Sequence, residues 1–295
     1  MGILLREPSK VFEHGVSPSM IDLWGLCKKR WYNKYIRQIE DVAGVEAYFG
    51  NGFDRFWKKY HFPGGIKPDV EKLVEEFKEF FPTSMDCEKR TQELGVKLIK
   101  GYVERYPKES EPVKYVWLDQ ELWVDMPTLK DVKLHIIIDG YGLNGEEAWV
   151  VDCKTTSRLG ADYFEQYKLS NQVTCYMWGV EQIIKKPLAG LLIDAVGCKK
   201  KVDADSFLRQ DFYKTKEQLE YGMRQVELKV KEMMDFTYAN WKNPEAFTME
   251  MTGTACKAFN KLCGFHEACE FNDKESALEG IKHRRKEFSN EGLSL

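Results

Sequence analysis

The sequence predicts a mixed α/β protein, with a central β-sheet flanked by helices and helical additions at both ends. Three observations support this class. The first third of the 295 residues repeats its apolar side chains at helical spacing, the stretch 114–153 is rich in β-forming residues, and a long amphipathic helix follows from Lys214 to about Trp241. No repeat or persuasive linker divides the chain. We therefore expect one domain over 1–295, made of a helical N-terminal part (17–110), a core (114–200) and a C-terminal part (201–295).

The helices of the first third have recognisable start signals and periodicity. Ser17 and Ser19 surround Pro18, which suits the first turn of a helix. One side of this helix is expected to carry Trp24, Cys27, Trp31 and Tyr35. Further helical patterns cover 46–61, 69–81 and 89–106.

The core begins where the hydrophobic period changes. Strands are predicted over 113–126, 133–143 and 146–156, and the sequence GLNGEE between the last two supplies hairpin turn chemistry. A helix is then predicted over 163–183 and a further strand over 188–197. This order gives a mixed sheet with helices packed on it.

Composition excludes several classes of protein. The net charge is -3 with 31% charged residues, so the overall charge does not indicate nucleic-acid binding. The first fifteen residues lack a signal peptide's apolar segment and no apolar run is long enough to span a membrane, so we expect a cytoplasmic protein. In a reducing compartment, the eight cysteines indicate a metal site, a cluster or plain burial rather than disulfides.

Two strand ends carry carboxylates. Asp139 ends the run IIID and Asp152 ends the run WVVD on the predicted partner strand. Two such carboxylates can converge on Mg²⁺ or Mn²⁺, which prefer oxygen ligands. Lys154 lies on the same strand face as Asp152, where it could orient or deprotonate a water or stabilise charge on a phosphate. Asp-x-Lys alone is more often a solvated strand edge.

A further pair of residues sharpens this interpretation. Gln172 and Tyr176 are four positions apart on the predicted helix and therefore share one face. The ordered set Asp139, Asp152-x-Lys154 and Gln172-x-x-x-Tyr176 resembles the RecB-like branch of the PD-(D/E)XK nuclease superfamily, over roughly residues 17–200. The resemblance implies a restriction-endonuclease-like core.

The resemblance also implies metal-dependent hydrolysis of DNA phosphodiesters. Asp139 and Asp152 would bind the metal, the carbonyl of Cys153 would be a further ligand, and Lys154 would position the water. Gln172 and Tyr176 would face DNA or support the site. A bound metal lowers the pKa of its water, so this chemistry needs no histidine base.

The sequence departs from the family pattern on the helix 46–61. Such nucleases often place a histidine four residues after a glycine, whereas here Asp54 follows Gly50. An aspartate also binds these metals, so Asp54 is our candidate for the first ligand, with His61 as the weaker substitute and a surface role for Asp54 as the alternative. Ile136 stands where a small residue is common.

The C-terminal cysteines suggest a second inorganic centre. Cys256, Cys263 and Cys269 lie close together in sequence, and Cys27 could supply a fourth thiolate. One cysteine before the core and three after it resemble relatives with a 4Fe-4S cluster, namely AddB-type subunits, CRISPR adaptation nucleases and phage exonucleases, where the cluster would clasp the chain ends. Zinc held by Cys256, Cys263, His266 and Cys269 remains an alternative, as do buried thiols.

DNA, single-stranded or as an end-bearing duplex, is the expected substrate. The stretch Lys28 to Tyr35 mixes basic and aromatic residues, which suits phosphate contacts and base stacking, although a solvated helix face over core aromatics is an equally good interpretation. Arg158 and Lys199 to Lys201 are further candidates.

We expect an exonuclease with a role in phage or mobile-element DNA processing. The alternatives are a CRISPR adaptation-type nuclease and a catalytically silent DNA-binding or assembly subunit. A recombination or CRISPR protein partner and a homo-oligomer are both compatible with the sequence.

Overall fold

The computed structural model describes residues 5–39, 44–63, 68–250, 252–258 and 261–271. They form two compact units, each assembled from separate parts of the chain. Unit 1 draws on Met1–Val42, Trp123–His135 and Gly222–Leu295, and unit 2 on Ala43–Leu122 and Ile136–Tyr221. Every carboxylate and lysine predicted for the DNA-cleaving site belongs to unit 2, and the four cysteines predicted for the cluster belong to unit 1.

The predicted mixed sheet is confirmed. Its five strands are β1 (Lys114–Asp125), β2 (Lys133–Asn144), β3 (Glu147–Thr156), β4 (Gly190–Gly197) and β5 (Phe207–Phe212), in that spatial order. β2 pairs with β3 and β4 with β5 in antiparallel fashion, whereas β3 and β4 are parallel. β5 was not predicted, because its sequence FLRQDF is short and only its two ends are buried.

Burial explains which strands are central. All eight residues of β4 are buried, as expected for a strand covered on both faces. β3 is buried from Ala148 to Cys153 and becomes less buried from Lys154 onward. The hairpin between β2 and β3 turns at Gly145, whose positive φ of 62° favours glycine.

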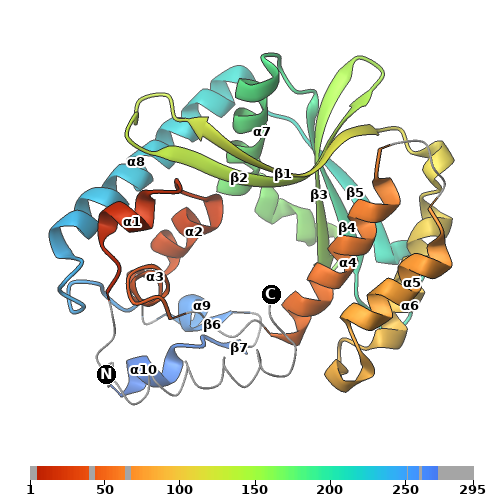
Figure 1. The fold of residues 1–295 in the computed structure, drawn as a ribbon, viewed down its shortest axis with the longest axis horizontal. Coiled ribbons are helices and arrows are strands. Elements are labelled where there is room, and N and C mark those ends of the chain that lie inside the picture. The colour runs from red at the N-terminus through yellow and green to blue at the C-terminus, as the bar shows by residue number, and fades with distance from the viewer. Residues whose placement is uncertain (1–4, 40–43, 64–67, 251, 259–260, 272–295) are drawn as a thin grey trace. The chain divides into compact units, whose positions relative to one another are not determined.

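The helices of unit 2 flank the sheet, with α4–α6 on one side and α7 on the other (Figure 1). Their bounds are α4 (Val45–His61), α5 (Val70–Phe80), α6 (Gln92–Arg105) and α7 (Asn171–Ile184). Side chains of Asp69 and Thr91 cap α5 and α6 by accepting hydrogen bonds from backbone amides of the first turn. Phe49 of α4 packs against Phe77 of α5, with ring centroids 5.6 Å apart.

The helix predicted over 163–183 begins later than expected. Ser170 accepts hydrogen bonds from the amides of Gln172 and Val173, which fixes the start of α7 at Asn171. The preceding residues form a separate 3₁₀ helix, η3 (Ala161–Tyr167). Three further 3₁₀ turns are η1 (Thr83–Met85), η2 (Lys108–Ser110) and η4 (Ala204–Ser206).

Unit 1 contains most of the remaining elements, and α8 begins in unit 2 and passes into unit 1 at Gly222. They are α1 (Pro8–Phe12), α2 (Pro18–Leu26), α3 (Lys28–Tyr35), α8 (Lys216–Asn240), α9 (Gly253–Cys256), β6 (Lys257–Ala258), β7 (Lys261–Leu262) and α10 (His266–Glu270). The expectation of one continuous helix through Cys27 was wrong. Cys27 adopts an extended conformation (φ -163°, ψ 110°) that ends α2 and starts α3.

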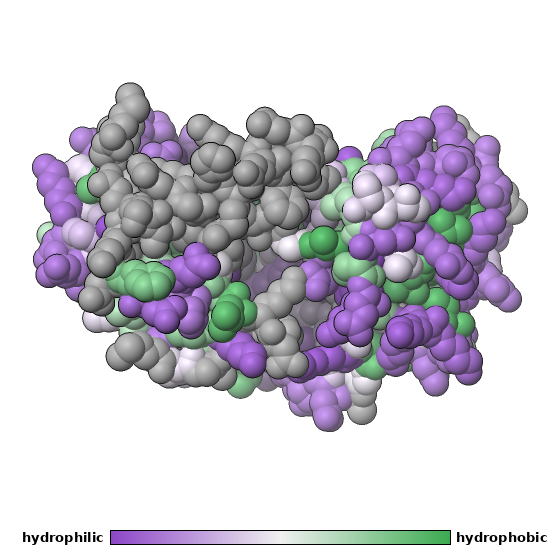
Figure 2. All heavy atoms as spheres, turned by 90° about the horizontal axis from the view of Figure 1, so that it is seen from below, coloured by the Kyte–Doolittle hydropathy of each residue, from purple (hydrophilic) through white to green (hydrophobic). Residues whose placement is uncertain are grey.

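Where the face in Figure 2 is coloured, hydrophilic side chains cover most of it and hydrophobic ones lie among them. Among the described residues, no helix has the length and apolar character required to span a bilayer.

Candidate active site

Asp139 of β2 and Asp152 of β3 lie close together, just beyond the last backbone pair of the β2–β3 ladder. The β2–β3 ladder runs from Asn144 paired with Glu147 to Gly140 paired with Val151. Asp139 and Asp152 are the next residues along the two strands. The carboxylate of Asp139 accepts a hydrogen bond from the backbone amide of Cys153, with 2.9 Å between Oδ2 and N. Beyond the last backbone pair, this side-chain hydrogen bond continues the contact between the two strands and holds Asp139 beside β3.

Asp152 is a buried acid with a lysine partner. Only 2% of its side chain is exposed, and its Oδ1 lies 2.7 Å from Nζ of Lys154. Burial raises the pKa of Asp152 to about 7, because the opposing effect of Lys154 is smaller and Asp139 adds to the increase. Burial by itself lowers the pKa of Lys154, but Asp152 and Asp139 outweigh this and raise it above its ordinary value. Lys154 is therefore a charged hydrogen-bond donor rather than a proton acceptor.

Asp54 reaches the same region from α4. A Cβ on Gly50 would lie 3.0 Å from Oγ1 of Thr155, so a glycine one turn before Asp54 allows α4 to approach β3 closely. Burial and the charge of Asp139 raise the pKa of Asp54 to about 6. Asp54 Oδ1 is buried without a hydrogen-bond partner. Of the two ligand candidates on this helix, Asp54 is the one that lies with Asp139.

Lys58 and Asp119 are site residues that the sequence analysis missed. Nζ of Lys58 lies 2.7 Å from Oδ2 of Asp54, 2.7 Å from Oδ1 of Asp119 and 3.7 Å from Oδ1 of Asp139. Burial lowers the pKa of Lys58, but hydrogen bonds to Asp119 and Asp54 raise it above its ordinary value. The i,i+4 spacing of Asp54 and Lys58 was a signal for this pair. No local pattern places Asp119, which comes from β1, beside them.

The Gln-x-x-x-Tyr pair lies on α7, where Tyr176 is within electrostatic range of Asp152 and Lys154. Nε2 of Gln172 donates a hydrogen bond to the hydroxyl of Tyr176 over 3.0 Å. Burial, followed by the charge of Asp152, raises the pKa of Tyr176 to about 12. Tyr163 and Tyr167 of η3, whose hydroxyl oxygens are 2.9 Å apart, also feel the charges of Lys154 and Asp152. Sequence patterns gave no signal for these two tyrosines.

A second polar network lies behind the site in the interior of unit 2. The fully buried Asp194 of β4 accepts hydrogen bonds at Oδ2 from Trp57, Tyr102 and Arg209 over 3.1, 2.5 and 3.1 Å. Arg209 also donates from two nitrogens to the two carboxylate oxygens of Glu111, over 3.0 and 2.9 Å. The network joins α4, α6, β4 and β5, and it holds the helix that carries Asp54.

His61 belongs to this network rather than to the carboxylate group. Its side chain is 1% exposed, and Nε2 lies 2.9 Å from the hydroxyl of Tyr102. Burial and the nearby Arg209 lower its pKa well below the ordinary value. His61 is therefore a neutral core residue in this structure, and its ring packs at tilted or edge-to-face angles against Trp57, Tyr60 and Tyr115.

The donor chemistry of the site suits a hard divalent cation, but the ligands are not arranged as a ready-made cage. Asp54, Asp139 and Asp152 offer the carboxylate oxygens that Mg²⁺ and Mn²⁺ prefer. All three carboxylates are paired with lysine ammonium groups, Asp54 and Asp139 with Lys58 and Asp152 with Lys154. Within the described part of the chain, no group of three or more His, Cys, Asp or Glu side chains is poised to hold a metal ion.

The same finding applies to the predicted cluster cysteines in unit 1. Cys263 donates its backbone amide to the carbonyl of Cys256 over 2.8 Å, which brings their backbones together across β6 and β7. Cys263 packs against Ile39, Phe265 and Ala268. Cys27 lies at the junction of α2 and α3. The described cysteines form no disulfide, and their thiols are not assembled as one metal-binding group.

Two of the aromatic residues of the basic stretch 28–35 belong to the core of unit 1. Trp31 and Tyr32 are fully buried, so the prediction that this stretch stacks on bases is wrong for both. Nζ of Lys29 donates to the carbonyl of Pro244 over 2.8 Å, and Lys28 lies 2.8 Å from Glu232. The helix-face interpretation fits these residues better.

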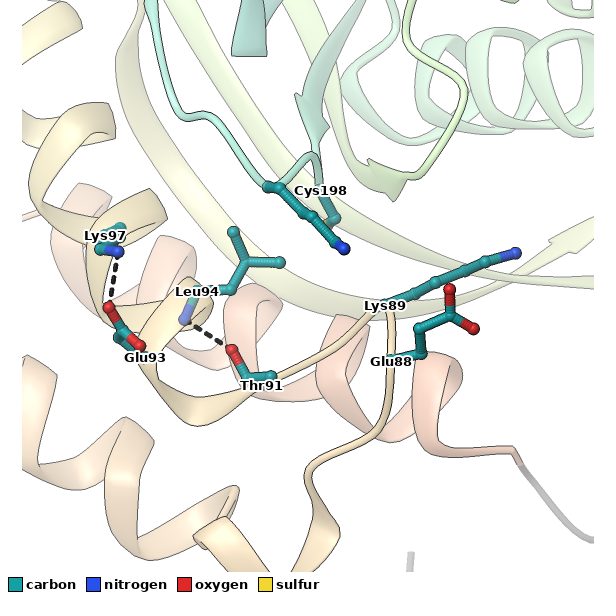
Figure 3. Close-up of a pocket in the computed structure, with 8 residues that line it drawn as sticks. Glu88, Lys89, Thr91, Glu93, Leu94, Lys97 and Cys198 are labelled. Carbon is teal, nitrogen blue, oxygen red and sulfur yellow. Dashed lines mark hydrogen bonds and ion pairs between the residues drawn. The ribbon is translucent and has the colours of Figure 1, made fainter.

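The lysine run after β4 borders a pocket in unit 2. The pocket has a volume of about 370 Å³ and lies between the start of α6 and the end of β4 (Figure 3). Its lining includes Lys89, Lys97 and Lys200 beside Glu88 and Glu93. Burial raises the pKa of the lining thiol, Cys198, to about 11, so this cysteine is a protonated wall residue rather than a nucleophile.

Comparisons with known proteins identify the family. No curated protein matches the sequence. The crystal structure of SSO0001 is similar over 65% of this chain and 77% of that chain, with 10% identity and a TM-score of 0.31, a likeness too distant to carry an argument. The family model for the PD-(D/E)XK nuclease superfamily matches residues 15–270, which is most of the chain. The chain therefore belongs to the PD-(D/E)XK nuclease superfamily.

Proposed function

We propose that this protein is a Mg²⁺- or Mn²⁺-dependent DNA exonuclease whose site is formed by Asp54, Asp139, Asp152 and Lys154. Family membership implies a metal-dependent nuclease. The observation that carries the site assignment is the convergence of Asp139 and Asp152 at the end of one ladder, with Lys154 2.7 Å from Asp152. The sequence motif and the three-dimensional arrangement thus point to the same residues.

Each residue has a role that follows from its chemistry. Asp139 and Asp152 would hold the cation together with Asp54, and the carbonyl of Cys153 remains a proposed further ligand. A bound cation would supply an activated water and neutralise charge on the phosphate. Lys154, protonated beside Asp152, would donate hydrogen bonds to the attacking water or to a phosphate oxygen and stabilise the negative charge that develops there.

The residues of α7 and η3 would support this chemistry from the substrate side. Gln172 and Tyr176 are hydrogen-bonded to each other, which fixes the direction of both side chains. We assign them to substrate or site support, because Tyr176 has a raised pKa and stays a neutral donor. Arg158 and the lysines of the pocket at the end of β4, Lys200 among them, are proposed contacts for the DNA backbone.

The preference for DNA ends and a phage or mobile-element role are supported by the resemblance to phage exonucleases. End-labelled linear DNA, single- and double-stranded, and covalently closed circular DNA of the same sequence separate the alternatives in Mn²⁺. We expect progressive release of nucleotides from the linear substrates and no nicking of the circle. Nicking of the circle would instead identify an endonuclease, and binding without cleavage of any substrate would identify a silent DNA-binding subunit.

A 4Fe-4S cluster held by Cys27, Cys256, Cys263 and Cys269 is also part of the proposal. All four cysteines belong to unit 1, although the described residues do not assemble them into a group. Protein purified without oxygen should be brown, absorb near roughly 400 nm, and contain iron and sulfide. Cys269→Ser should lose this colour, whereas Cys87→Ser should keep it. A colourless, zinc-containing preparation would contradict the cluster and favour the site of Cys256, Cys263, His266 and Cys269.

A further inference from the structure

Lys58 holds an unusual position for a lysine beside a set of metal-binding carboxylates. Its ammonium group lies 2.7 Å from Asp54 and 3.7 Å from Asp139, so it stands between two of the proposed ligands. Only 18% of the side chain is exposed. Because the helical i,i+4 spacing holds Asp54 and Lys58 side by side, the ammonium cannot diffuse away as a solvent ion would.

Asp119 gives the same ammonium group a second place to bind. Its Oδ1 lies 2.7 Å from Nζ of Lys58, and the Asp119 side chain is 63% exposed. Asp119 has a positive φ of 54° within β1, a conformation that costs a non-glycine residue free energy and is maintained only by surrounding contacts. This backbone geometry accompanies a carboxylate that contacts Lys58 and whose exposed side chain extends into solvent.

Charge balance indicates what this arrangement accomplishes. The formal charges are four carboxylates, Asp54, Asp119, Asp139 and Asp152, against two ammonium groups, Lys58 and Lys154. The remaining two negative charges equal the charge of one divalent cation. A cation that binds Asp54 and Asp139 would lie close to the present ammonium position, and repulsion would favour a shift of Lys58 toward Asp119.

We infer that Lys58 and Asp119 are positioning residues that control cation binding: Lys58 occupies the space between Asp54 and Asp139, and Asp119 accepts its ammonium group when a divalent cation enters. This inference rests on the proposed function, since it takes Asp54 and Asp139 as ligands. Asp119 thus promotes metal binding without touching the metal. Its effect must disappear when Lys58 is absent.

A double-mutant cycle with Mn²⁺ as the probe tests the inference, with free Mn²⁺ measured by electron paramagnetic resonance at pH 8. Lys58→Met should bind Mn²⁺ about tenfold more tightly than wild type, because the competing charge is removed. Asp119→Asn should bind about threefold to tenfold more weakly, because Lys58 then remains on Asp54 and Asp139. In the Lys58→Met background, Asp119→Asn should change the affinity less than about twofold.

Two control variants guard against general charge effects and misfolding. Lys59→Met alters the next lysine on α4, whose ammonium group lies 2.6 Å from Glu76 of α5 and not beside the proposed ligands. This variant should leave Mn²⁺ affinity unchanged. Lys58→Arg keeps the positive charge and should retain an affinity near that of wild type even if Lys58→Met folds poorly.

The outcomes that overturn the inference are distinct from those that overturn the proposed function. If Asp119→Asn weakens Mn²⁺ binding equally in the presence and absence of Lys58, Asp119 acts as a direct ligand or through its general negative charge, and not through Lys58. Unchanged affinity in Lys58→Met would remove Lys58 from metal control. Absence of Mn²⁺ binding in wild type, or binding that survives Asp139→Asn, would overturn the metal site itself and the inference with it.

Discussion

The backbone amide of Cys153 donates a hydrogen bond of 2.9 Å to the carboxylate of Asp139 on the neighbouring strand. This bond lies immediately beyond the last pair of the β2–β3 ladder, Gly140 with Val151. It fixes one acid of the site to the strand that carries the other acid and the lysine. Because β2 and β3 each pair with a strand on both sides, the proposed site residues are carried by a rigid support.

The metal-free protein should become less stable as the pH rises through the range in which Asp152 titrates. Burial raises the pKa of Asp152 to about 7 from an ordinary value of 3.8, and that of Asp54 to about 6. Between about pH 4 and 7 the folded protein therefore holds protons that the unfolded chain has released, so an increase in pH favours unfolding. Asp152→Asn should reduce this slope by at most about 1.4 kcal/mol per pH unit.

Urea unfolding in EDTA at several values between pH 5 and 8 measures this effect. The curves of unfolding free energy against pH for wild type and Asp152→Asn should converge toward low pH. Parallel curves across the whole range would mean that Asp152 is charged throughout and that its burial has no effect on its titration.

Lys154→Met should abolish most turnover while the protein still binds metal. Loss of the ammonium group removes charge stabilisation during hydrolysis, an effect on the order of 10²- to 10³-fold in kcat. The same change removes the partner that lowers the pKa of Asp152, so Mn²⁺ binding and DNA cleavage should both be measured over a series of pH values above 8. Lys78→Met, which alters an exposed lysine 2.7 Å from Glu75 on α5, is the control and should cleave normally. A loss of Mn²⁺ binding as large as the loss of cleavage would assign Lys154 to metal-site integrity instead.

Arg209→Met should destabilise the fold whether or not metal is present. Its guanidinium pairs with Asp194 and Glu111, whose side chains are 0% and 4% exposed, so its removal leaves two buried carboxylates without their cation. Breaking such a buried network costs about 3–5 kcal/mol. Thermal and urea unfolding in EDTA measure this directly. Lys216→Met, which alters an exposed pair 3.9 Å long with Glu220, should have little effect, and similar small losses in both variants would refute a structural role for the network.

The sequence predicted the parts of the fold and site that depend on local pattern. Alternation along β3 predicted that Asp152 and Lys154 share one strand face, and their side chains are 2.7 Å apart in the structure, because the side-chain direction in a strand has a period of two. The glycine-spaced position on α4 likewise pointed to Asp54. These assignments needed only the two strands, their hairpin and one helix.

The parts that failed depend on contacts between distant segments. Asp119 meets Lys58 only because β1 and α4 pack near each other, and nothing in the local sequence of β1 distinguishes Asp119 from other exposed acids. His61 contacts Tyr102 rather than Asp54 or Asp139, because α6 packs against α4 and brings Tyr102 to it. Trp31 and Tyr32 looked suited to base stacking until the packing of Phe247 against both rings showed them to be core residues.

Cleavage of end-labelled DNA in Mn²⁺ by wild type and Asp152→Ala tests the central claim most directly. Asp205→Asn, a change at an exposed acid of η4, serves as the control. We predict that wild type and Asp205→Asn degrade the DNA at equal rates and that Asp152→Ala is at least about 10²-fold slower, because it lacks a metal ligand at the centre of the site. Equal rates for wild type and Asp152→Ala would contradict the assignment of this site.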